Sequence, residues 1–417
     1  MSIAPDPKQI ILVDPSDFTT PYDLALARAI EAQGRRVRLV GKAGSLPHRQ
    51  GLQHGHFYPI LAAPWGQRLP SATVRLIKGV CHGVDMLRLF SLRAAIEAGI
   101  VHFQWSPLPA IDCCIMRSLR RRVPVVLTLH DSHPYQGGAS WLMRQGYVNL
   151  LRSFHAIIVH TQQAQRRVTE MGIDPAVIYR IPHGLLGDRG HLTTPPTRRP
   201  RRERLVLLQF GKMKPYKGID LLLEALTLVP RGLRDRLEVR IVGKPYMDTA
   251  AIARYVHAND LAACVTLRFE FVNEAEVERL FADADAILLP YRDIDASGVA
   301  MSAVARGVPI LATAIEGFRE LFEEGGGAHL VPADDAAALS RAIANWISTP
   351  EQLDALAEAI VLRRATIPSW DEIARLHFAV YTEARFRWIA GRKREQGAAL
   401  AGRDDERAAR NHCRGLH

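Results

Sequence analysis

The sequence predicts an α/β protein of two domains, each a doubly wound parallel sheet with helices on its faces. Short apolar runs of strand length alternate with segments of helical periodicity in both halves of the chain, which is the pattern of a parallel sheet. With 417 residues, 48% hydrophobic and 23% charged, the chain is globular and long enough for about two or three domains. We expect Rossmann-like domains at residues 1–190 and 204–368.

The first half begins with a strand at 9–13, a loop, and a helix at 21–33 that starts at Pro21 and ends at Gly34. Further strands are expected at 36–40, 100–104, 123–129 and 156–160. The first loop reads VDPSDFTTPYD and lacks the G-x-G-x-x-G fingerprint of nicotinamide-dependent dehydrogenases. A dehydrogenase is therefore disfavoured.

His130 and Asp131 directly follow the strand at 123–129. The carboxyl end of a sheet strand is where ligands bind in open α/β sheets, and an imidazole beside a carboxylate can move protons near neutral pH. Because His and Asp are also common in turns, a catalytic and a structural role for this pair are equally supported.

The second half opens with a strand, a cationic loop and a helix over residues 204–225, which read RLVLLQFGKMKPYKGIDLLLEA. A helix start offers free N–H groups and a positive dipole end, to which Lys212, Lys214 and Lys217 add full charges. The loop predicts a diphosphate site, with Lys217 as a surface side chain. The alternative is an ordinary strand–helix unit with solvated lysines, and the absence of a Gly-Lys-Ser/Thr ending excludes a Walker A loop.

A second stretch of the same kind covers residues 286–321. A strand at 286–289 is followed by Ser297, which can cap a helix from Gly298 to residue 306, and by a strand at 308–313. The free N–H groups at the start of this helix form a second candidate phosphate site.

These stretches resemble the C-terminal half of nucleotide-sugar glycosyltransferases of the GT-B fold, in particular the family 4-like group. The matching segments are FGKMKPYKGIDLLLEAL, IPHG at 181–184, ADAILLPY at 284–291, and SGVAMSAVARGVPILAT followed by Glu320. They extend over about half of the chain in the family's order. The resemblance implies two Rossmann-like domains facing a cleft and a C-terminal helix, at 369–390, that crosses back to the first domain.

The resemblance also implies site residues and the chemistry they perform. Leaving-group charge on a nucleoside diphosphate would be stabilised by the lysines and helix starts. An inverting reaction would need a base, for which Asp131 or His130 is the candidate, whereas in a retaining reaction the leaving phosphate could take the proton. The donor-binding candidates are Gly211, Lys212, Lys217, Asp293, Asp295, Ser297, Gly298 and Glu320, and the further cleft candidates are Thr19, Thr20, Tyr22 and His183.

One feature of the family is missing. Most family 4 enzymes carry two glutamates eight positions apart in the second motif, but Ile294 and Ser302 occupy those places here. Asp293 and Asp295 are the two candidates to replace the first glutamate. Without the two glutamates, the identity of the sugar and the anomeric outcome of the reaction stay open. A catalytically inactive sugar-nucleotide-binding or scaffold protein is therefore an alternative, and a sugar-nucleotide epimerase of the same architecture is another.

No metal or other cofactor is expected. Asp283 and Asp285 spell a D-x-D pair, but they lie in a segment that matches GT-B chains, which usually need no metal. The five cysteines lack metal-ligand spacing. The proline-rich, arginine-rich segment at 191–203 predicts an interdomain linker, and the charged segment at 391–417 predicts a disordered tail or a frayed helix.

The positive charge is concentrated in the first half. Residues 1–200 carry 24 Lys and Arg against 12 Asp and Glu, within a net charge of +11 for the chain. With no nucleic-acid motif and no apolar span or signal peptide, we expect a cytoplasmic protein attached to the inner face of the cell membrane. The expected donor is a nucleotide sugar, with GDP-mannose favoured, and the expected acceptor is a glycan or a polyprenyl-diphosphate-linked glycan. The candidate membrane-contacting residues are Arg117, Arg120, Arg121, Arg122, Arg166 and Arg167.

Overall fold

The computed structural model describes residues 9–15, 19–42, 54–57, 80, 82–84, 86–87, 99–106, 108–132, 141–187, 203–323 and 326–414. The chain forms two compact units. One comprises residues 1–159, 165–181 and 371–417, and the other comprises residues 160–164 and 182–370. The predicted linker at 191–203 lies outside the described residues except for Glu203.

The first unit is built on a seven-stranded sheet in the order β3-β2-β1-β4-β5-β6-β7, in which every pairing is parallel. Strands β1, β2, β4, β5 and β6 lie where the sequence predicted strands, whereas β3 and β7 were not predicted. Its strands are β1 (Gln9–Asp14), β2 (Arg36–Lys42), β3 (His54–Phe57), β4 (Ile100–Phe103), β5 (Val125–Leu129), β6 (Ala156–Val159) and β7 (Ile178–Arg180). Its helices include α1 (Thr20–Ala32), α4 (Pro109–Leu119), α5 (Trp141–Leu151) and α6 (Gln162–Glu170), the last of which extends across the boundary between the units.

The second unit is built on a six-stranded parallel sheet in the order β10-β9-β8-β11-β12-β13. The strands are β8 (Leu205–Phe210), β9 (Leu237–Val242), β10 (Val265–Arg268), β11 (Ala286–Leu289), β12 (Ile310–Thr313) and β13 (Ala328–Val331). The helices are α8 (Ile219–Leu228), α9 (Arg231–Arg234), α10 (Ala250–Ala258), α11 (Glu274–Asp283), α12 (Gly298–Ala305), α13 (Glu316–Phe322), α14 (Ala336–Ser348) and α15 (Glu351–Thr366). Both sheets are thus the doubly wound, parallel sheets of two Rossmann-like domains.

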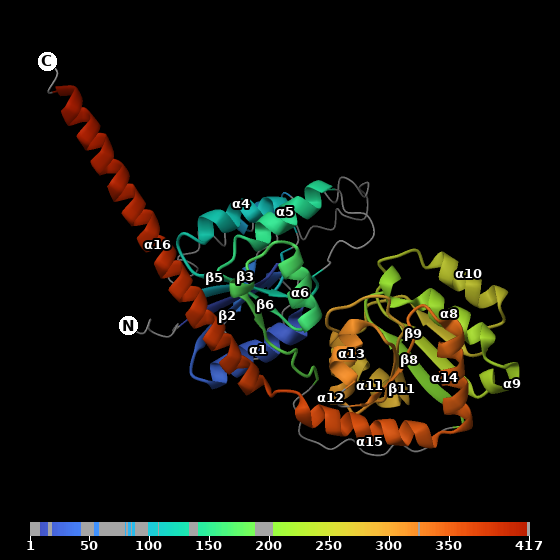
Figure 1. Ribbon diagram of the computed structural model, residues 1–417. Coiled ribbons are helices and arrows are strands. Elements are labelled where there is room, and N and C mark those ends of the chain that lie inside the picture. Colours follow the sequence, from blue (N-terminus) through green and yellow to red (C-terminus); the bar gives the residue numbers. More distant parts are fainter. Residues whose placement is uncertain are drawn as a thin grey trace. The chain divides into compact units, whose positions relative to one another are not determined.

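Helices cover both faces of the second sheet (Figure 1). Successive strand residues point to opposite faces, so Leu207 joins one core with α8, α10 and α14, while Leu208 joins the other with α11, α12 and α13. Burial on both faces explains why the strands read as unbroken apolar runs instead of alternating patterns.

The C-terminal helix α16 (Trp370–Arg414) returns to the first unit, where it packs from Asp371 onward. The Gln33 amide donates to the Asp371 carbonyl at 2.8 Å, and Arg387 donates to the Ala176 carbonyl at 2.7 Å. We expected a helix to residue 390 with either disorder or a frayed helix beyond it, and the helix continues to Arg414 (Figure 1). Residues 391–414 contain no proline and are rich in Ala and Arg, which both favour a helix.

No helix in the described part of the chain is long and apolar enough to cross a lipid bilayer.

Candidate donor site and family

Lys217 is the centre of the candidate site in the second unit. The loop after β8 closes with a short 3-10 turn, η3 (Pro215–Lys217), whose geometry brings the Lys217 side chain inside. Its Nζ donates to the Tyr291 hydroxyl at 3.0 Å and lies 4.8 Å from the centre of that ring. The side chain is only 9% exposed, so the expectation of a surface lysine is wrong. Burial lowers the pKa of Lys217 from 10.5 to about 8.

Tyr291 connects this lysine to the second motif. It follows β11 and is buried, which raises the pKa of its hydroxyl, while a hydrogen bond with Ser297 acts in the opposite direction. Ser297 caps α12 as predicted, because its hydroxyl accepts from the Ala300 N–H at 3.2 Å. The two motifs, about eighty residues apart in sequence, therefore meet through one tyrosine.

Glycines allow the backbone to come close to this centre. Gly211 has a φ of 113°, and a Cβ at this position would lie 3.1 Å from Lys217 Nζ and 3.4 Å from a methyl group of Val299. The Gly243 backbone packs against Gly211 so closely that a Cβ at position 243 would lie 1.8 Å from the Gly211 carbonyl oxygen. The Gly211 backbone therefore lies next to both the Lys217 ammonium and the first turn of α12.

Arg292 and Gln209 hold the lysine loop in place. The Arg292 guanidinium forms two bonds of 2.8 Å with Asp220 at the start of α8, and it also pairs with Asp334 at 2.7 Å. The Gln209 amide donates to the Lys217 carbonyl at 2.9 Å from a buried position. Bidentate charge-assisted bonds fix geometry well, so these contacts set the position of Lys217 before a ligand arrives.

The other donor-binding candidates lie on the same edge of the second sheet. Lys212 is half-buried in the loop after Gly211, Asp293 is half-buried, Asp295 is buried, and Gly298 begins α12. Glu320, in contrast, is exposed on α13, and both of its carboxylate oxygens accept from the Gln162 N–H at 2.8 Å.

His183 belongs to the second unit and lies beside His160, with ring centres 5.0 Å apart. Its Nδ1 donates to the Gly184 carbonyl at 2.7 Å, and burial lowers its pKa to about 4. His183 is therefore neutral at physiological pH, which suits a hydrogen-bond donor or acceptor better than a permanent cation.

The first-loop candidates in the first unit form a compact structure of their own. Asp14 at the end of β1 accepts from the Thr19 N–H at 2.8 Å, and the Thr19 hydroxyl lies 3.1 Å from both oxygens of Asp23. Thr20 begins α1 and is half-buried. These contacts rigidify the start of α1, so Thr19 has a structural role whatever else it does.

Tyr22 of α1 meets His130, one of the predicted catalytic pair that follows β5. The Tyr22 ring meets the His130 ring edge-on at 4.8 Å, and burial together with Asp23 raises the pKa of the Tyr22 hydroxyl. His130 Nε2 lies 3.1 Å from Gln104 Oε1, and Asp131 is half-buried beside it.

Behind His130 lies a buried polar network that sequence reasoning missed. His102 Nε2 bonds to Thr128 Oγ at 2.8 Å, and His102 Nδ1 bonds to the Tyr381 hydroxyl of α16 at the same distance. Gln104 joins this group to His130. The signal in the sequence was the pair of polar residues in the otherwise apolar strand HFQW, which we treated only as a strand.

Comparisons with known proteins give the family and the fold. Residues 204–349 match the family described as Glycosyl transferases group 1, and residues 23–185 match the one described as Glycosyltransferase Family 4. A D-inositol 3-phosphate glycosyltransferase of Geodermatophilus obscurus is 31% identical over 56% of this chain and 53% of its own length. The match thus covers about half of that relative.

A second relative matches over more of its length. A GDP-mannose:glycolipid 4-beta-D-mannosyltransferase of Xanthomonas campestris pv. campestris is 26% identical over 71% of this chain and 84% of its own.

Solved structures show the same fold at low identity. Sucrose-phosphate synthase from Thermosynechococcus elongatus has a TM-score of 0.69 and 18% identity, covering 90% of this chain and 98% of its own. Anabaena HepE in complex with UDP and glucose has a TM-score of 0.67 and 17% identity, and the match covers 88% of this chain and 97% of the HepE chain. The two family matches and the two Rossmann-like domains show that the chain belongs to the group 1, family 4-like glycosyltransferases of the GT-B fold.

Proposed function

We propose that this protein transfers a sugar from a nucleoside-diphosphate donor, held at the Lys217 site, to a hydroxyl of a glycan or lipid-linked acceptor. The observation that supports this most is the buried Lys217 ammonium, placed beside Gly211 and the start of α12. A buried cation without a carboxylate bonded to it is costly, and a diphosphate would offset that cost. The family membership supplies the reaction class.

The chemistry follows from charge development at the leaving group. As the bond between sugar and diphosphate breaks, negative charge grows on the phosphate oxygens, and a fixed ammonium stabilises it more in the transition state than in the ground state. The N–H groups at the start of α12 add a second stabilising group. His130 and Asp131 are the candidates for a base if the reaction inverts the anomeric centre, whereas the leaving phosphate takes the proton if it retains it.

We propose GDP-mannose as the donor and a polyprenyl-diphosphate-linked glycan as the acceptor. The support is the Xanthomonas relative, whose name gives GDP-mannose and a glycolipid, together with the Tyr-Arg-x-x-x-x-Ser-Gly form of the second motif at residues 291–298. The test is a panel of GDP- and UDP-sugars incubated with such an acceptor, with mass spectrometry of the lipid product. Transfer from a UDP-sugar alone would refute the donor assignment, and donor hydrolysis without transfer would refute the acceptor.

We also propose that the protein works at the inner face of the cell membrane, docked through basic side chains of the first unit. Each basic residue near an anionic bilayer contributes about 1 kcal/mol, so a few arginines give reversible attachment. In vesicle flotation, binding should rise with anionic lipid and fall with salt, and charge reversal at Arg120, Arg121 and Arg122 should weaken it. The matched control reverses three exposed arginines of the second unit, Arg231, Arg254 and Arg341. Equal flotation with neutral and anionic vesicles would contradict the proposal.

A further inference from the structure

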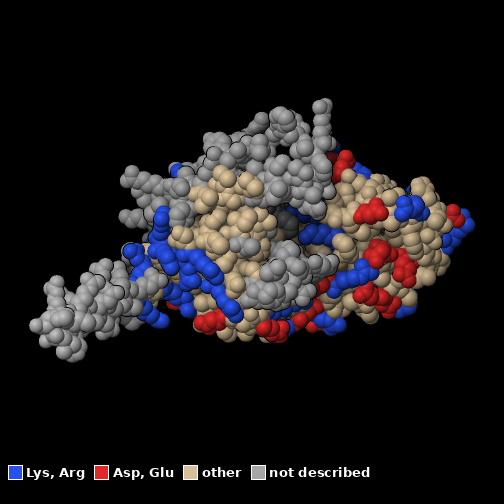
Figure 2. Space-filling view, turned by 90° about the horizontal axis from the view of Figure 1, so that it is seen from above, with Lys and Arg blue, Asp and Glu red and all other residues tan. Residues whose placement is uncertain are grey.

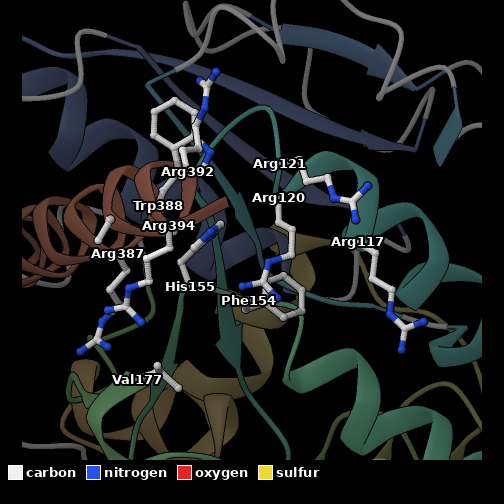
Figure 3. A pocket seen from close by; sticks show the side chains of 12 residues that line it. Arg117, Arg120, Arg121, Phe154, His155, Val177, Arg387, Trp388, Arg392 and Arg394 are labelled. Atoms are coloured by element: carbon white, nitrogen blue, oxygen red, sulfur yellow. The ribbon is translucent and has the colours of Figure 1, made fainter. Parts of the chain in front are cut away.

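A cavity of about 520 Å³ lies in the first unit between the end of α4 and the middle of α16. Its walls carry six arginines that come from two segments almost three hundred residues apart (Figure 3). Three of them lie at the end of α4 and just after it, and three lie on α16: Arg117, Arg120, Arg121, Arg387, Arg392 and Arg394. Figure 2 shows a band of Lys and Arg side chains on one face of the protein.

Within the described part of the chain, no carboxylate pairs with any of these six guanidinium groups. Arg120 donates to the Arg152 carbonyl at 3.3 Å and Arg387 to the Ala176 carbonyl, both of which are neutral acceptors. Elsewhere the protein does pair buried or half-buried arginines, as in Arg306 with Glu278 at 3.0 Å. The cavity therefore concentrates positive charge that the described residues leave uncompensated.

The rest of the cavity wall is mostly apolar, with Phe154, Val177 and Trp388 among its side chains. Phe154 is buried in the wall, and the Arg392 guanidinium lies 5.0 Å from the centre of the Trp388 ring. Apolar walls beside guanidinium groups give a ligand both contact area and charge.

His155 lies in the cavity wall as a neutral side chain. Its Nδ1 accepts from the Val125 N–H at 3.1 Å, so the hydrogen of the neutral ring is on Nε2. Burial lowers the pKa of His155 to about 4, and Arg120 and Arg387 contribute to the shift. A neutral histidine adds a further donor without adding to the repulsion among the arginines.

We propose that this cavity is a binding site for a phosphate-bearing ligand, either a diphosphate or two neighbouring phosphate groups, separate from the sugar-donor site. Guanidinium forks match phosphate oxygens in a bidentate manner, and a multiply charged ligand can contact several of these arginines at once. The ligand's source is a soluble phosphorylated compound or the headgroup of an anionic lipid. The inference does not depend on the proposed transferase activity.

The first experiment uses inorganic diphosphate as the probe, in the full-length protein with Lys217→Ala so that the donor site does not contribute. Calorimetry and Trp388 fluorescence should both show binding at constant ionic strength, and the fluorescence change should disappear in Trp388→Phe. Arg117→Gln with Arg392→Gln should weaken affinity about a hundredfold, since each of the two lost charge-assisted bonds costs about tenfold. Both side chains are exposed, so the fold should survive.

The matched control is Arg254→Gln with Arg341→Gln, which removes the same two charges from exposed positions of the second unit and should change affinity less than twofold. No binding above a salt blank, or equal binding in the double variant, overturns the proposal. A second set of measurements identifies the source. Vesicles with phosphatidic acid that compete with diphosphate for the cavity indicate a lipid headgroup, whereas diphosphate binding that such vesicles leave unchanged indicates a soluble ligand.

Discussion

The substitution Lys217→Met is expected to raise the free energy of unfolding while it lowers the turnover of the enzyme. In the folded state burial lowers the Lys217 pKa from 10.5 to about 8, so keeping the ammonium charged at pH 7 costs about 3 kcal/mol at about 1.4 kcal/mol per unit. The methionine removes this cost and keeps most of the volume, but it loses the bond to the Tyr291 hydroxyl, which contributes about 1 kcal/mol. The variant should therefore be more stable than the wild type by about 2 kcal/mol, while its turnover falls about a hundredfold or more.

The pH dependence gives a second readout of the same side chain. Between pH 8 and 10.5 the unfolded chain binds more protons at Lys217 than the folded protein does, so this lysine makes wild-type stability rise with pH across that window. The stability gain of Lys217→Met over the wild type should therefore shrink as the pH rises from 8 to 10.5. Affinity for a nucleoside diphosphate should fall as pH rises through about 8, because the free protein then loses the charge that binds it.

The assays are urea unfolding at pH 7 and pH 10, together with nucleoside diphosphate release from a donor. The structural reasoning is refuted if Lys217→Met is destabilised by several kcal/mol with no dependence on pH. It is equally refuted if the variant retains wild-type turnover, since a lysine that touches the leaving group cannot be removed without a cost in rate.

Three further changes test neighbouring contacts. Ser297→Ala removes the cap of α12 and should weaken nucleoside diphosphate binding by about 1 kcal/mol in calorimetry; equal affinity would show that the helix start does not meet the ligand. Gly243→Ala places a methyl group against the Gly211 carbonyl and should lower the unfolding midpoint by several degrees, and an unchanged midpoint would contradict the close crossing. Tyr381→Phe leaves His102 short of one partner and should cost about 1 kcal/mol in urea unfolding, with donor binding unchanged.

Much of the fold could be predicted because it follows from local patterns. The apolar runs, the proline at the start of α1 and the serine cap of α12 each specify an element without reference to the rest of the chain. The limits of α16 could not be predicted in this way. Residues 370–390 have an apolar stripe that packs on the first unit, whereas the residues beyond lack one, and we weighed that absence above their helix propensity.

The sequence predicted individual residues of the site, but it did not predict the contacts among them. Spacing placed Lys217 and Ser297 on loops at the same edge of one sheet, but the tyrosine that joins them appeared only as an apolar motif residue. The burial of Lys217 depends on the left-handed Gly218 and the 3-10 turn before it, which direct the side chain inward. His102 and Tyr381 meet only because α16 returns to β4, a long-range contact that no local pattern encodes.

The central claim is that a buried, easily deprotonated lysine holds the diphosphate of a sugar donor. Calorimetric titration of the wild type and of Lys217→Met with GDP and with UDP at pH 7 tests it most directly. The account predicts that the wild type binds one of the two nucleotides, and that Lys217→Met weakens the affinity at least tenfold while remaining folded. Wild-type affinity in the folded variant, or no binding of either nucleotide by the wild type, would contradict it.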